Sequence, residues 1–506
     1  MLRFTDNLLD RITMYRLLLY YLGVLLVAAA ALSQLNYLHY QPVVVLFSPL
    51  YLMAVCWLSN AMFAAAFKAP VNRESSLITA LILALIITPD ASPRNLIFLT
   101  AAGGLAMASK YLLAINKKHL FNPAAVAVLL TSLGAGHSAS WWVGNNYLLP
   151  VVLIGGLLLT RKVRRFQMVL SFLLTSLAAV VGYSLLGHNN LSVMLHQMIL
   201  HSSLFFLAFV MLTEPVTSPS KVKQQRWYGA LAGLLFPPQV HLLGYYTTPE
   251  AVLVVSNVFA YLVNLRLKVF PRSVRKVKIG PGLVDFVFTP ATPFTFQPGQ
   301  YMEWTLQHHG PDARGERRYF TLASSPTEPE IRLGVRFYEN GSSYKRALLA
   351  IDAQTPFVGA QLGGDFTLPA NKQQKLAFIA GGIGITPYRS MVKYLLDNNQ
   401  QRDVSLLYSA TSSEELAYTD IFESARQRLN SNVNYIITDS SAALPSPHYH
   451  TGRLSTELIK QLVPDYAERL FYISGSHPMV HAMQVALREL GVPRTQIKVD
   501  FFPGYA

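Results

Sequence analysis

Three glycines and two residues that follow them carry the clearest chemical signal in the sequence. Gly381, Gly382 and Gly384 come directly after an apolar run, which is typical of a buried strand in a parallel sheet. Thr386 as a cap and Pro387 in the first turn then favour a helix. Glycines let a backbone turn tightly beside a ligand, and the free N–H groups at a helix N-terminus attract phosphate. The pattern predicts a nucleotide-binding loop, although a plain turn after a strand has the same local pattern.

As a whole, this stretch resembles a loop of a known reductase superfamily. The string Phe378–Met391, Phe-Ile-Ala-Gly-Gly-Ile-Gly-Ile-Thr-Pro-Tyr-Arg-Ser-Met, is similar to the nicotinamide-nucleotide loop of the ferredoxin–NADP reductase superfamily. The resemblance implies that NADH or NADPH binds at these glycines and at the helix that follows them.

A second string resembles the flavin motif Arg-x-Tyr-Ser of the same superfamily. It is Arg317–Ser324, Arg-Arg-Tyr-Phe-Thr-Leu-Ala-Ser, with Arg318, Phe320 and Thr321 at the matching positions. The resemblance implies bound FAD. Arg318 would neutralise its pyrophosphate, the Phe320 ring would pack on the flavin, and the Thr321 hydroxyl would bond near flavin N5. Phe320 replaces the usual Tyr, so only the packing contact is expected there.

Two shorter strings fit the same superfamily. Asn340–Tyr344 resembles the Gly/Ser turn whose helix faces the pyrophosphate, and Tyr472–Met479 resembles the Cys-Gly-Pro-x-x-Met segment beside the nicotinamide. The cofactor-binding residues implied by these two strings are Gly341, Ser342, Ser343, Gly475 and Met479. Ser474 stands where the superfamily usually has Cys. The resemblance makes Thr321 and Ser474 the catalytic candidates.

The choice of nucleotide and the cover of the flavin can also be predicted. Discriminating NADPH requires a cation for the 2′-phosphate, and Ser409–Glu415 offers hydroxyls and acids but no Lys or Arg. The sequence therefore favours NADH. In the aromatic tail, Phe501 is predicted either to cover the flavin or to pack on the strands that hold it.

The patterning around these strings predicts two folds. Short alternating runs predict a small antiparallel barrel over 283–370, the FAD domain: Val284–Thr289, Tyr301–Leu306, Arg318–Ala323 and Ile331–Tyr338. Apolar runs separated by helical segments predict an open parallel sheet over 371–506, the NAD domain: Leu376–Ala380, Val404–Tyr408, Tyr435–Thr438 and Leu470–Ser474. Ligands are expected at the carboxyl ends of the parallel strands.

Composition separates the first 270 residues from the rest. The chain has 506 residues, of which 52% are hydrophobic and 14% charged, too apolar for an ordinary soluble enzyme. Residues 1–270 hold 18 Lys+Arg against 6 Asp+Glu, placed between long apolar runs. A nucleic-acid binder would carry such charge on a polar folded surface, so no nucleic-acid partner is expected. Cys56 is the only cysteine, which excludes disulfides within one chain, Cys-ligated clusters and Cys-rich zinc sites, and no metal site is predicted.

Apolar windows predict an α-helical polytopic membrane domain of about ten helices over 1–270, followed by a basic linker over 271–282. The predicted spans lie near 13–34, 42–66, 76–90, 94–112, 122–136, 146–160, 167–187, 198–213, 228–246 and 250–266. The even-numbered connections and both ends carry all the Lys and Arg residues except Arg94. By the positive-inside rule, both termini are cytoplasmic in a multi-pass, bacterial-type inner membrane.

Two Pro-containing stretches of this domain resemble the membrane subunits of the Nqr and Rnf electron-transport complexes. They are Phe121–Ala124, Phe-Asn-Pro-Ala, and Glu214–Pro219, Glu-Pro-Val-Thr-Ser-Pro. The resemblance implies a second flavin, FMN or riboflavin, beside Asn122, Thr217 and Ser218. The Ser-Gly-Ala-Thr string that carries covalent FMN in those subunits does not occur here. From the residues alone, the two stretches are a capped helix start and a helix stop.

Together these patterns predict an NAD(P)H-dependent flavin oxidoreductase bound to the lipid bilayer. A cytoplasmic FAD domain would oxidise the nucleotide and pass electrons into the membrane domain, through a second flavin, to a quinone or an extracytoplasmic flavin or electron-carrier protein.

Three alternatives remain open. A haem-containing reductase of the ferric-reductase or NADPH-oxidase type needs stacked His pairs, whereas a polar loop interrupts His188 and His201, and His241 has no companion. An electron-driven ion pump needs acids within the spans, but the acids here lie near span ends. A flavin transporter with a regulatory reductase domain would explain the membrane motifs without electron transfer.

Overall fold

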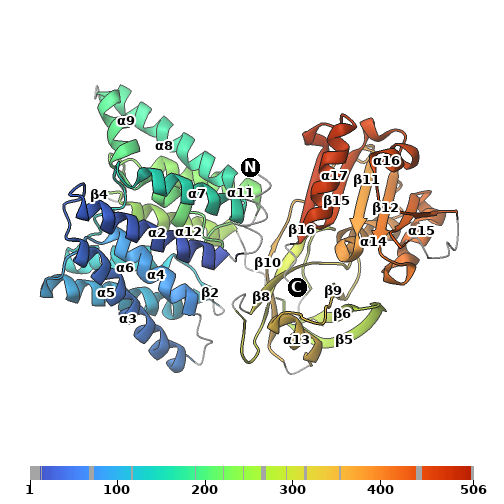
Figure 1. The fold of residues 1–506 in the computed structure, drawn as a ribbon, viewed down its shortest axis with the longest axis horizontal. Helices are drawn as coiled ribbons and strands as arrows, with labels where there is room; N and C mark the ends of the chain where they lie inside the picture. Colours follow the sequence, from blue (N-terminus) through green and yellow to red (C-terminus); the bar gives the residue numbers. More distant parts are fainter. Residues whose placement is uncertain are drawn as a thin grey trace. The chain divides into compact units, whose positions relative to one another are not determined.

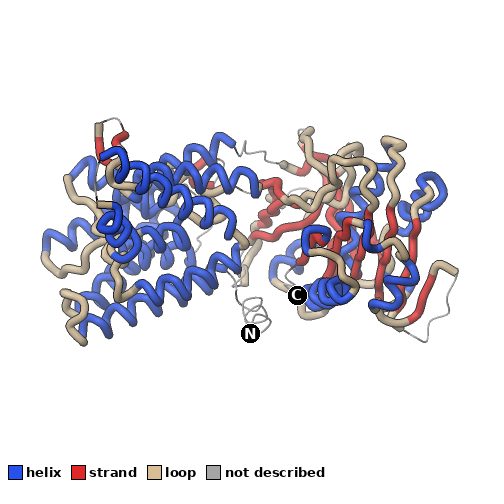
Figure 2. Tube along the Cα trace, turned by 90° about the horizontal axis from the view of Figure 1, so that it is seen from above, coloured by secondary structure: helices blue, strands red, loops and turns tan. Residues whose placement is uncertain are grey.

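The computed structural model describes residues 12, 14–67, 73–115, 118–187, 190–219, 221–242, 244–263, 269–291, 293–312, 316–352, 355–439 and 447–502. The chain divides into two compact units, Met1–Leu265 and Arg266–Ala506 (Figure 1). Helices make up nearly all of the first unit, and strands gather in the second (Figure 2).

The N-terminal unit is a bundle of apolar helices around one core. Its helices are α2 (Met14–Gln34), α3 (Pro42–Ala66), α4 (Arg73–Ile86), α5 (Pro93–Leu112), α6 (Pro123–Ala135), α7 (Leu149–Val163), α8 (Phe166–Gly187), α9 (Leu191–Leu200), α10 (Leu204–Phe206), the π-helical η1 (Leu207–Met211), α11 (Val222–Leu235) and α12 (Pro249–Val263). Two short hairpins, β1 (Ala114–Ile115) with β2 (Lys118–His119) and β3 (His241–Leu242) with β4 (Tyr245–Tyr246), complete it.

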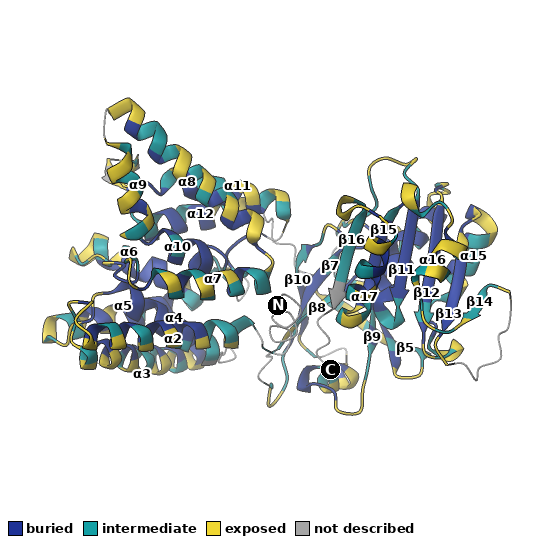
Figure 3. Cartoon of the chain, turned by 45° about the horizontal axis from the view of Figure 1, so that its top comes forward, coloured by how far each residue is buried: buried dark blue, intermediate teal, exposed yellow. Residues whose placement is uncertain are grey.

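The outer face of this bundle is apolar. Large side chains such as Val27, Val43 and Leu186 are 65%, 76% and 83% exposed, and exposed positions line the outer faces of α3 and α8 (Figure 3). A soluble surface rarely carries so many exposed apolar side chains, so these faces fit a lipid environment. Small residues bring helices together inside: a Cβ added to Gly229 of α11 would lie 2.3 Å from the Met168 carbonyl oxygen of α8.

Three of the described helices, α2, α3 and α8, are long and apolar enough to cross a membrane. The bent pair Leu191–Leu200 and Leu204–Met211 makes a fourth if it is one span. Every predicted span overlaps a helix of the unit, but several of these helices are shorter than a full crossing. The ten-span topology therefore stays a prediction.

The C-terminal unit begins with six antiparallel strands in two sheets. One sheet has the order β5-β6-β9 and the other β10-β7-β8. The strands are β5 (Pro271–Gly280), β6 (Leu283–Pro290), β7 (Tyr301–Leu306), β8 (Arg317–Thr321), β9 (Ile331–Arg336) and β10 (Phe357–Gly363), with helix α13 (Ser343–Ala350) between the last two. Both sheets and α13 share one hydrophobic core around Trp304. All four strand runs expected in this region form strands, while the closure of the sheets into a barrel stays a prediction.

The prediction of a linker over 271–282 is wrong for most of its length. Residues Pro271–Gly280 form β5, which pairs with β6 in a register that sets Val274 opposite Phe288. β5 lies at the edge of its sheet, where a proline and several exposed cations are tolerated. The Pro, Gly and Lys/Arg content that suggested a linker is therefore the composition of an edge strand.

The rest of the unit is a six-stranded, all-parallel sheet with the order β14-β13-β12-β11-β15-β16. Its strands are β11 (Leu376–Gly381), β12 (Val404–Ala410), β13 (Asn432–Ile437), β14 (Tyr449–Thr451), β15 (Leu470–Ser476) and β16 (Ile497–Phe502). The helices are α14 (Thr386–Asp397), α15 (Thr419–Leu429), α16 (Thr456–Leu462) and α17 (His477–Glu489), with 3-10 turns η2 (Gly382–Ile385) and η3 (Ser413–Glu415). Cores on both sheet faces hold them, α14 and α15 on one and α16 and α17 on the other. The strand order reverses at β11, so a ligand crevice is expected at its carboxyl end.

Candidate functional site

The glycine loop leaves β11 in a conformation that favours glycine. Gly382 has φ +52°, in the left-handed region, and opens the turn η2. Helix α14 follows with Pro387 in its first turn. The predicted cap is wrong in its detail: Thr386 is the first residue of α14, and its hydroxyl donates to the carbonyl of Ile383. The 3-10 turn occupies the position at which a side-chain cap would otherwise sit.

Two strings that lie almost 100 residues apart in the sequence meet at this loop. β11 and β15 pair in parallel, with Ala380 opposite Ser474. A Cβ added to Gly381 would lie 2.0 Å from Met479 Sδ, and one added to Gly384 would lie 2.5 Å from the carbonyl oxygen of Ser474. Glycine is needed at Gly384 because the backbone of one strand end packs directly on the other, whereas at Gly381 the close neighbour is the flexible Met479 side chain. The predicted nicotinamide-binding residues are thus brought together at the carboxyl edge of the sheet.

Phe501 reaches the same edge through its backbone. It lies in β16 and pairs with Gly475 of β15. Its side chain falls outside what the structure describes, so its predicted role toward the flavin stays a prediction.

The two catalytic candidates are buried hydroxyls without a partner, a feature that some helix residues of the N-terminal unit, such as Ser33 and Ser176, share. Thr321 is 3% exposed and Ser474 is 0% exposed, and neither hydroxyl has a hydrogen-bond partner among the described residues. A buried hydroxyl without a partner costs free energy, and such groups are uncommon in folded proteins. Both fit a site in which a bound ligand supplies the missing partner, as the predicted flavin and nicotinamide rings would.

The residues predicted to hold the FAD pyrophosphate cluster at the start of α13. Ser342 caps this helix, its Oγ accepting from the N–H of Lys345 at 3.3 Å. The guanidinium of Arg318 lies over the Tyr344 ring, 4.9 Å from its centroid. Gly341 donates its N–H to the carbonyl of Tyr338 at 3.0 Å in the turn that precedes the helix. A cation beside a helix N-terminus is a suitable environment for a diphosphate.

Asp312 was not predicted, and it organises this cluster. It accepts the Ser343 N–H at 3.1 Å, and its own N–H donates to Ser343 Oγ at 2.9 Å. Its carboxylate lies 3.6 Å from Arg318 Nη2. Phe320 lies nearby, with its ring centroid 6.1 Å from that of Tyr344. Asp312 belongs to a loop without periodicity, so no sequence pattern marked it.

The helix after the glycine loop is tied to the antiparallel sheets. Arg389 of α14 donates from Nη2 to Glu328 Oε1 at 2.8 Å and from Nη1 to the carbonyl of Ala323 at 3.0 Å. Ser390 Oγ donates to the carbonyl of Ser324 at 2.6 Å. Burial opposes the ionisation of Glu328, but Arg389 outweighs it and holds the pKa of this carboxyl below its ordinary value. These bonds fix the glycine loop relative to Thr321, which lies only a few residues before Ser324.

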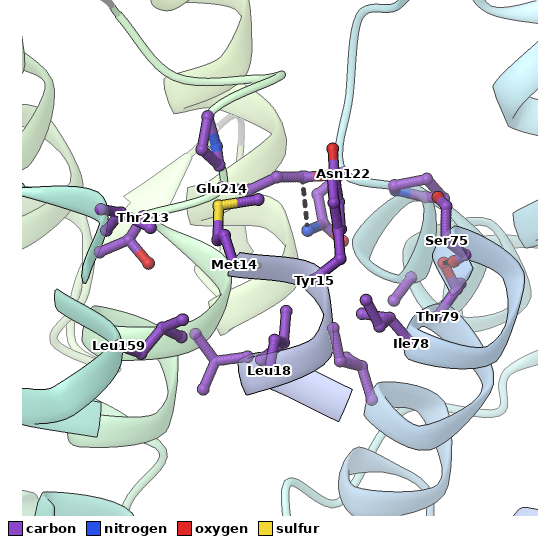
Figure 4. Close-up of a pocket in the computed structure, with 16 residues that line it drawn as sticks. Met14, Tyr15, Leu18, Ser75, Ile78, Thr79, Asn122, Leu159, Thr213 and Glu214 are labelled. Atoms are coloured by element: carbon purple, nitrogen blue, oxygen red, sulfur yellow. Dashed lines mark hydrogen bonds between the residues drawn. The ribbon is translucent and has the colours of Figure 1, made fainter. Parts of the chain in front are cut away.

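In the N-terminal unit, the two Pro-containing stretches also meet. Asn122 caps α6, its Oδ1 accepting from the N–H of Ala125 at 3.2 Å. Its Nδ2 donates to Glu214 Oε2 at 3.0 Å (Figure 4). Thr217 Oγ1 donates to the same oxygen at 2.9 Å. Ser218 Oγ donates to the Glu214 carbonyl.

Asn257 of α12 connects the two stretches. It accepts from the Asn122 N–H at 2.9 Å and donates to the Thr217 carbonyl at 3.2 Å. The capped helix start predicted from the residues alone is confirmed for Asn122, and the cap is also one side of a polar cluster.

A cavity of about 50 Å³ opens beside this cluster. Glu214, Asn122, Ser75, Thr79 and Thr213 give it polar walls, and apolar side chains of α2, α4, α6, α7 and η1 give most of the rest (Figure 4). Thr217 and Ser218 do not line the cavity, but both donate hydrogen bonds to Glu214, which does line it. This volume holds a few water molecules and is far below the roughly 300–1,000 Å³ of ordinary ligand pockets, so a ring could enter only if the surrounding side chains move.

The histidines do not form a recognisable cofactor site in the part of the chain that the structure describes. His196 and His201 lie with ring centroids 5.4 Å apart, and His241 packs against Tyr246. His188 falls outside the described residues. Within these residues, no three His, Cys, Asp or Glu side chains gather closely enough to hold a metal ion.

Two family models match parts of the chain. Residues 378–485 match the oxidoreductase NAD-binding domain, and residues 142–265 match the NQR2, RnfD, RnfE family. The chain therefore carries an oxidoreductase NAD-binding domain after a domain of the NQR2, RnfD, RnfE family.

Curated relatives match the C-terminal part. The glycine betaine monooxygenase reductase subunit of Chromohalobacter salexigens is 25% identical over 41% of this chain and 56% of its own length. The flavohemoprotein of Pseudomonas putida is 28% identical over 46% of this chain and 58% of its own. The chain spans about half the length of these relatives. Among solved structures, the FAD/NAD-binding domain of a nitric oxide dioxygenase from Vibrio cholerae is 22% identical, covering 46% of this chain and 98% of that one, with a TM-score of 0.40.

Proposed function

We propose that this protein is a membrane-bound flavin oxidoreductase that oxidises NADH on FAD in the C-terminal unit and passes the electrons into the N-terminal unit. One observation carries the proposal. The glycine loop and the Ser474–Met479 segment pack at one carboxyl edge of a parallel sheet, within residues that match an oxidoreductase NAD-binding domain. The curated relatives in this region include a reductase subunit and flavohemoproteins, which agrees with this chemistry.

Each residue of the C-terminal site has a role that its position supports. Arg318 and the N-terminus of α13 bind the pyrophosphate of FAD, and the loop around Gly382 admits the phosphates of the nucleotide. Thr321 and Ser474 have unpartnered hydroxyls that would each hydrogen-bond to a bound ring. Bound FAD supplies the chemistry that accepts a hydride and releases electrons one at a time.

The N-terminal unit is proposed to receive the electrons at the Asn122–Glu214 cluster. Its match to the NQR2, RnfD, RnfE family, its apolar outer face and the polar cluster around Glu214 support a bound flavin, FMN or riboflavin, or a quinone at this place. The final acceptor is then a quinone or an electron carrier outside the membrane. The distribution of Lys and Arg supports a bacterial-type inner membrane with both termini in the cytoplasm.

Two electron acceptors separate the two halves of this proposal. With the full chain in detergent, NADH oxidation is measured with ferricyanide, a soluble acceptor that can take electrons from FAD, and with a short-chain quinone. We expect Glu214→Gln to lower quinone reduction about tenfold or more while ferricyanide reduction stays within twofold. Glu74→Gln is the matched control, because Glu74 makes a surface ion pair with Arg16 and does not line the cavity.

The outcomes separate the alternatives. Equal loss with both acceptors in Glu214→Gln contradicts the transfer of electrons through the cluster. Absence of NADH oxidation with either acceptor contradicts the whole proposal. Riboflavin uptake into proteoliposomes that persists after Arg318→Ala favours the flavin transporter instead.

A further inference from the structure

The start of helix α11 carries positive charge that the chain itself does not neutralise. Lys221, Lys223 and Arg226 are exposed, and none of them has an acidic partner among the described residues. Residues 91–249 include a single acid, Glu214, whose carboxylate is bonded within its own cluster. The first turn of α11 has no acid either, although this end of a helix favours negative charge over positive. An anion from outside the chain would offset these three cations.

Helix α8 lies alongside α11 and begins at the same end. Arg226 Nε donates to Gln167 Oε1 at 2.7 Å, and Ser171 Oγ donates to the Arg226 carbonyl at 2.8 Å. Further along, a Cβ added to Gly233 would lie 2.5 Å from the carbonyl oxygen of Phe172, so the two backbones are in close contact. The two helices therefore present one shared surface, on which the Arg226 guanidinium is held by a side chain of α8.

Apolar side chains continue from these cations along the outer faces of both helices. Leu170 and Leu174, one turn apart on α8, are 57% and 56% exposed (Figure 3). On α11, Trp227 is 62% exposed, and Leu234, two turns further on the same face, is 53% exposed. Trp side chains are common at the boundary between lipid headgroups and hydrocarbon. The surface thus has a cationic end, an aromatic side chain and an apolar length, in that order.

We propose that this surface of α8 and α11 binds an anionic phospholipid. The phosphate lies against Lys221, Lys223 and Arg226, and the acyl chains lie along the exposed leucines. A soluble anion would match the cations but would leave the apolar faces uncovered, whereas a phospholipid matches both parts. A zwitterionic phospholipid carries its own cation beside the phosphate, so its attraction to three cations is weaker.

The proposed lipid surface is connected to the Glu214–Pro219 stretch. Arg165, directly before α8, donates from Nη1 to the Pro219 carbonyl at 2.8 Å, and Gln225 of α11 donates from Nε2 to the same oxygen at 3.2 Å. Both side chains are buried. A bound lipid would therefore contact the two helices that hold this stretch in place.

Trp227 makes the proposal measurable, because bromine atoms on an acyl chain quench a nearby tryptophan. The full chain with Trp57→Phe is the parent protein, since Trp57 is the other tryptophan that is exposed. Trp141, Trp142 and Trp304 are buried. The parent is placed in phosphatidylcholine vesicles that contain a minor share of brominated lipid, either phosphatidylglycerol or phosphatidylcholine. We expect the quenching to report brominated phosphatidylglycerol enriched about tenfold over brominated phosphatidylcholine beside Trp227.

Three variants of the parent make the result specific. Lys223→Gln with Arg226→Gln should lower the enrichment to less than about threefold, and loss of cations from this end of α11 does not weaken the helix. Arg16→Gln is the matched control: it removes an exposed cation of α2 that Glu74 already neutralises, so the enrichment should change by less than about twofold. Trp227→Phe should abolish the difference between the two brominated lipids, because it removes the reporter.

The outcomes decide between a specific lipid site and its alternatives. Equal quenching of the parent by the two brominated lipids would overturn the proposal. An enrichment that survives Lys223→Gln with Arg226→Gln, or that Arg16→Gln lowers as much, would overturn it too, since the overall positive charge of the unit would then be the cause. Loss of the enrichment on addition of millimolar inorganic phosphate at constant ionic strength would assign the cations to a soluble anion instead. None of these measurements uses a nucleotide or an electron acceptor, so they stand apart from the proposed function.

Discussion

Arg389 of α14 and Glu328, 61 residues earlier in the chain, form a two-point ion pair that joins the helix after the glycine loop to the antiparallel sheets. Their side chains are 5% and 15% exposed. Glu328 also accepts the Ser325 N–H at 2.7 Å. Removal of one partner would leave a largely buried charge without its counterion, which is more costly than loss of a surface pair.

The first prediction concerns the stability that this pair supplies. Arg389→Met should destabilise the C-terminal unit by about 2–3 kcal/mol, since Glu328 keeps only its hydrogen bond and a more distant cation. The release of FAD on heating should then occur about 5–10 °C lower. Lys393→Met on the same helix removes an i,i+4 pair with Asp397 and should cost less than about 1 kcal/mol. Equal decreases in the temperature of FAD release in the two variants would show that the Arg389–Glu328 pair stabilises the unit no more than the Lys393–Asp397 pair does.

The second prediction is the pH dependence of the same pair. Because Arg389 outweighs burial and lowers the pKa of Glu328, the folded state binds this proton less readily than the unfolded state does. Its stabilisation is fully present above the ordinary value of 4.5 and is lost as pH falls through the lower folded-state pKa. The difference in melting temperature between the unchanged protein and Glu328→Gln should be largest near neutral pH and shrink in acid. A constant difference from pH 7 to pH 3 would contradict this origin.

The third prediction uses the two close approaches of the glycine loop. Gly381→Ala pushes against Met479 Sδ, the end of a flexible side chain, whereas Gly384→Ala pushes against the Ser474 backbone. Met479→Ala should therefore restore much of the NADH affinity lost in Gly381→Ala. No such relief is available for Gly384→Ala, because the obstructing atoms belong to the main chain. NADH titrations of the single and double variants measure this, and equal rescue of both glycine variants would be unexpected.

The fourth prediction separates a ligand role from a structural one. Thr321→Ala and Ser474→Ala remove buried hydroxyls that have no partner among the described residues, so stability should stay unchanged or rise by up to about 1 kcal/mol. Reduction of FAD by NADH, followed by stopped flow, should slow at least about tenfold. Ser405→Ala is the control: its hydroxyl is buried near the opposite end of β12 and accepts from Asn432. A loss of stability without a loss of rate would assign the two hydroxyls to the core.

Local strings of the sequence anticipated much of the fold and the location of the site. The apolar run before Gly381 forms β11, and the Ser474–Met479 string lies beside it, because glycine spacing and strand periodicity are local properties. The cap at Thr386 and the linker over 271–282 were wrong, since a 3-10 turn and an edge strand have little distinctive local pattern. β14 and β16 were also not predicted; β14 is three residues long, and β16 carries Lys498 and Asp500.

The contacts that hold the site together were beyond prediction from patterns. Arg389 and Glu328 are 61 residues apart, and Arg336 and Glu415 are 79 apart. Asn257 reaches Asn122 across 135 residues. Such pairs depend on how elements pack, and a charged or amide residue in its own segment looks like any other solvated one. The only sign of such a pairing in the sequence is that an Arg and a Glu both lie within or next to motif strings. This sign is weak.

The most direct test of electron transfer between the two units is the cofactor content of the full chain purified in detergent, combined with anaerobic titration by NADH. The proposed relay predicts FAD and a second flavin in each chain, and full reduction that takes up more than one NADH per FAD. FAD together with the absorption bands of a low-spin haem would contradict the two-flavin relay and favour a haem-containing reductase. FAD alone, reduced by one NADH without any quinone reduction, would contradict the transfer of electrons into the N-terminal unit.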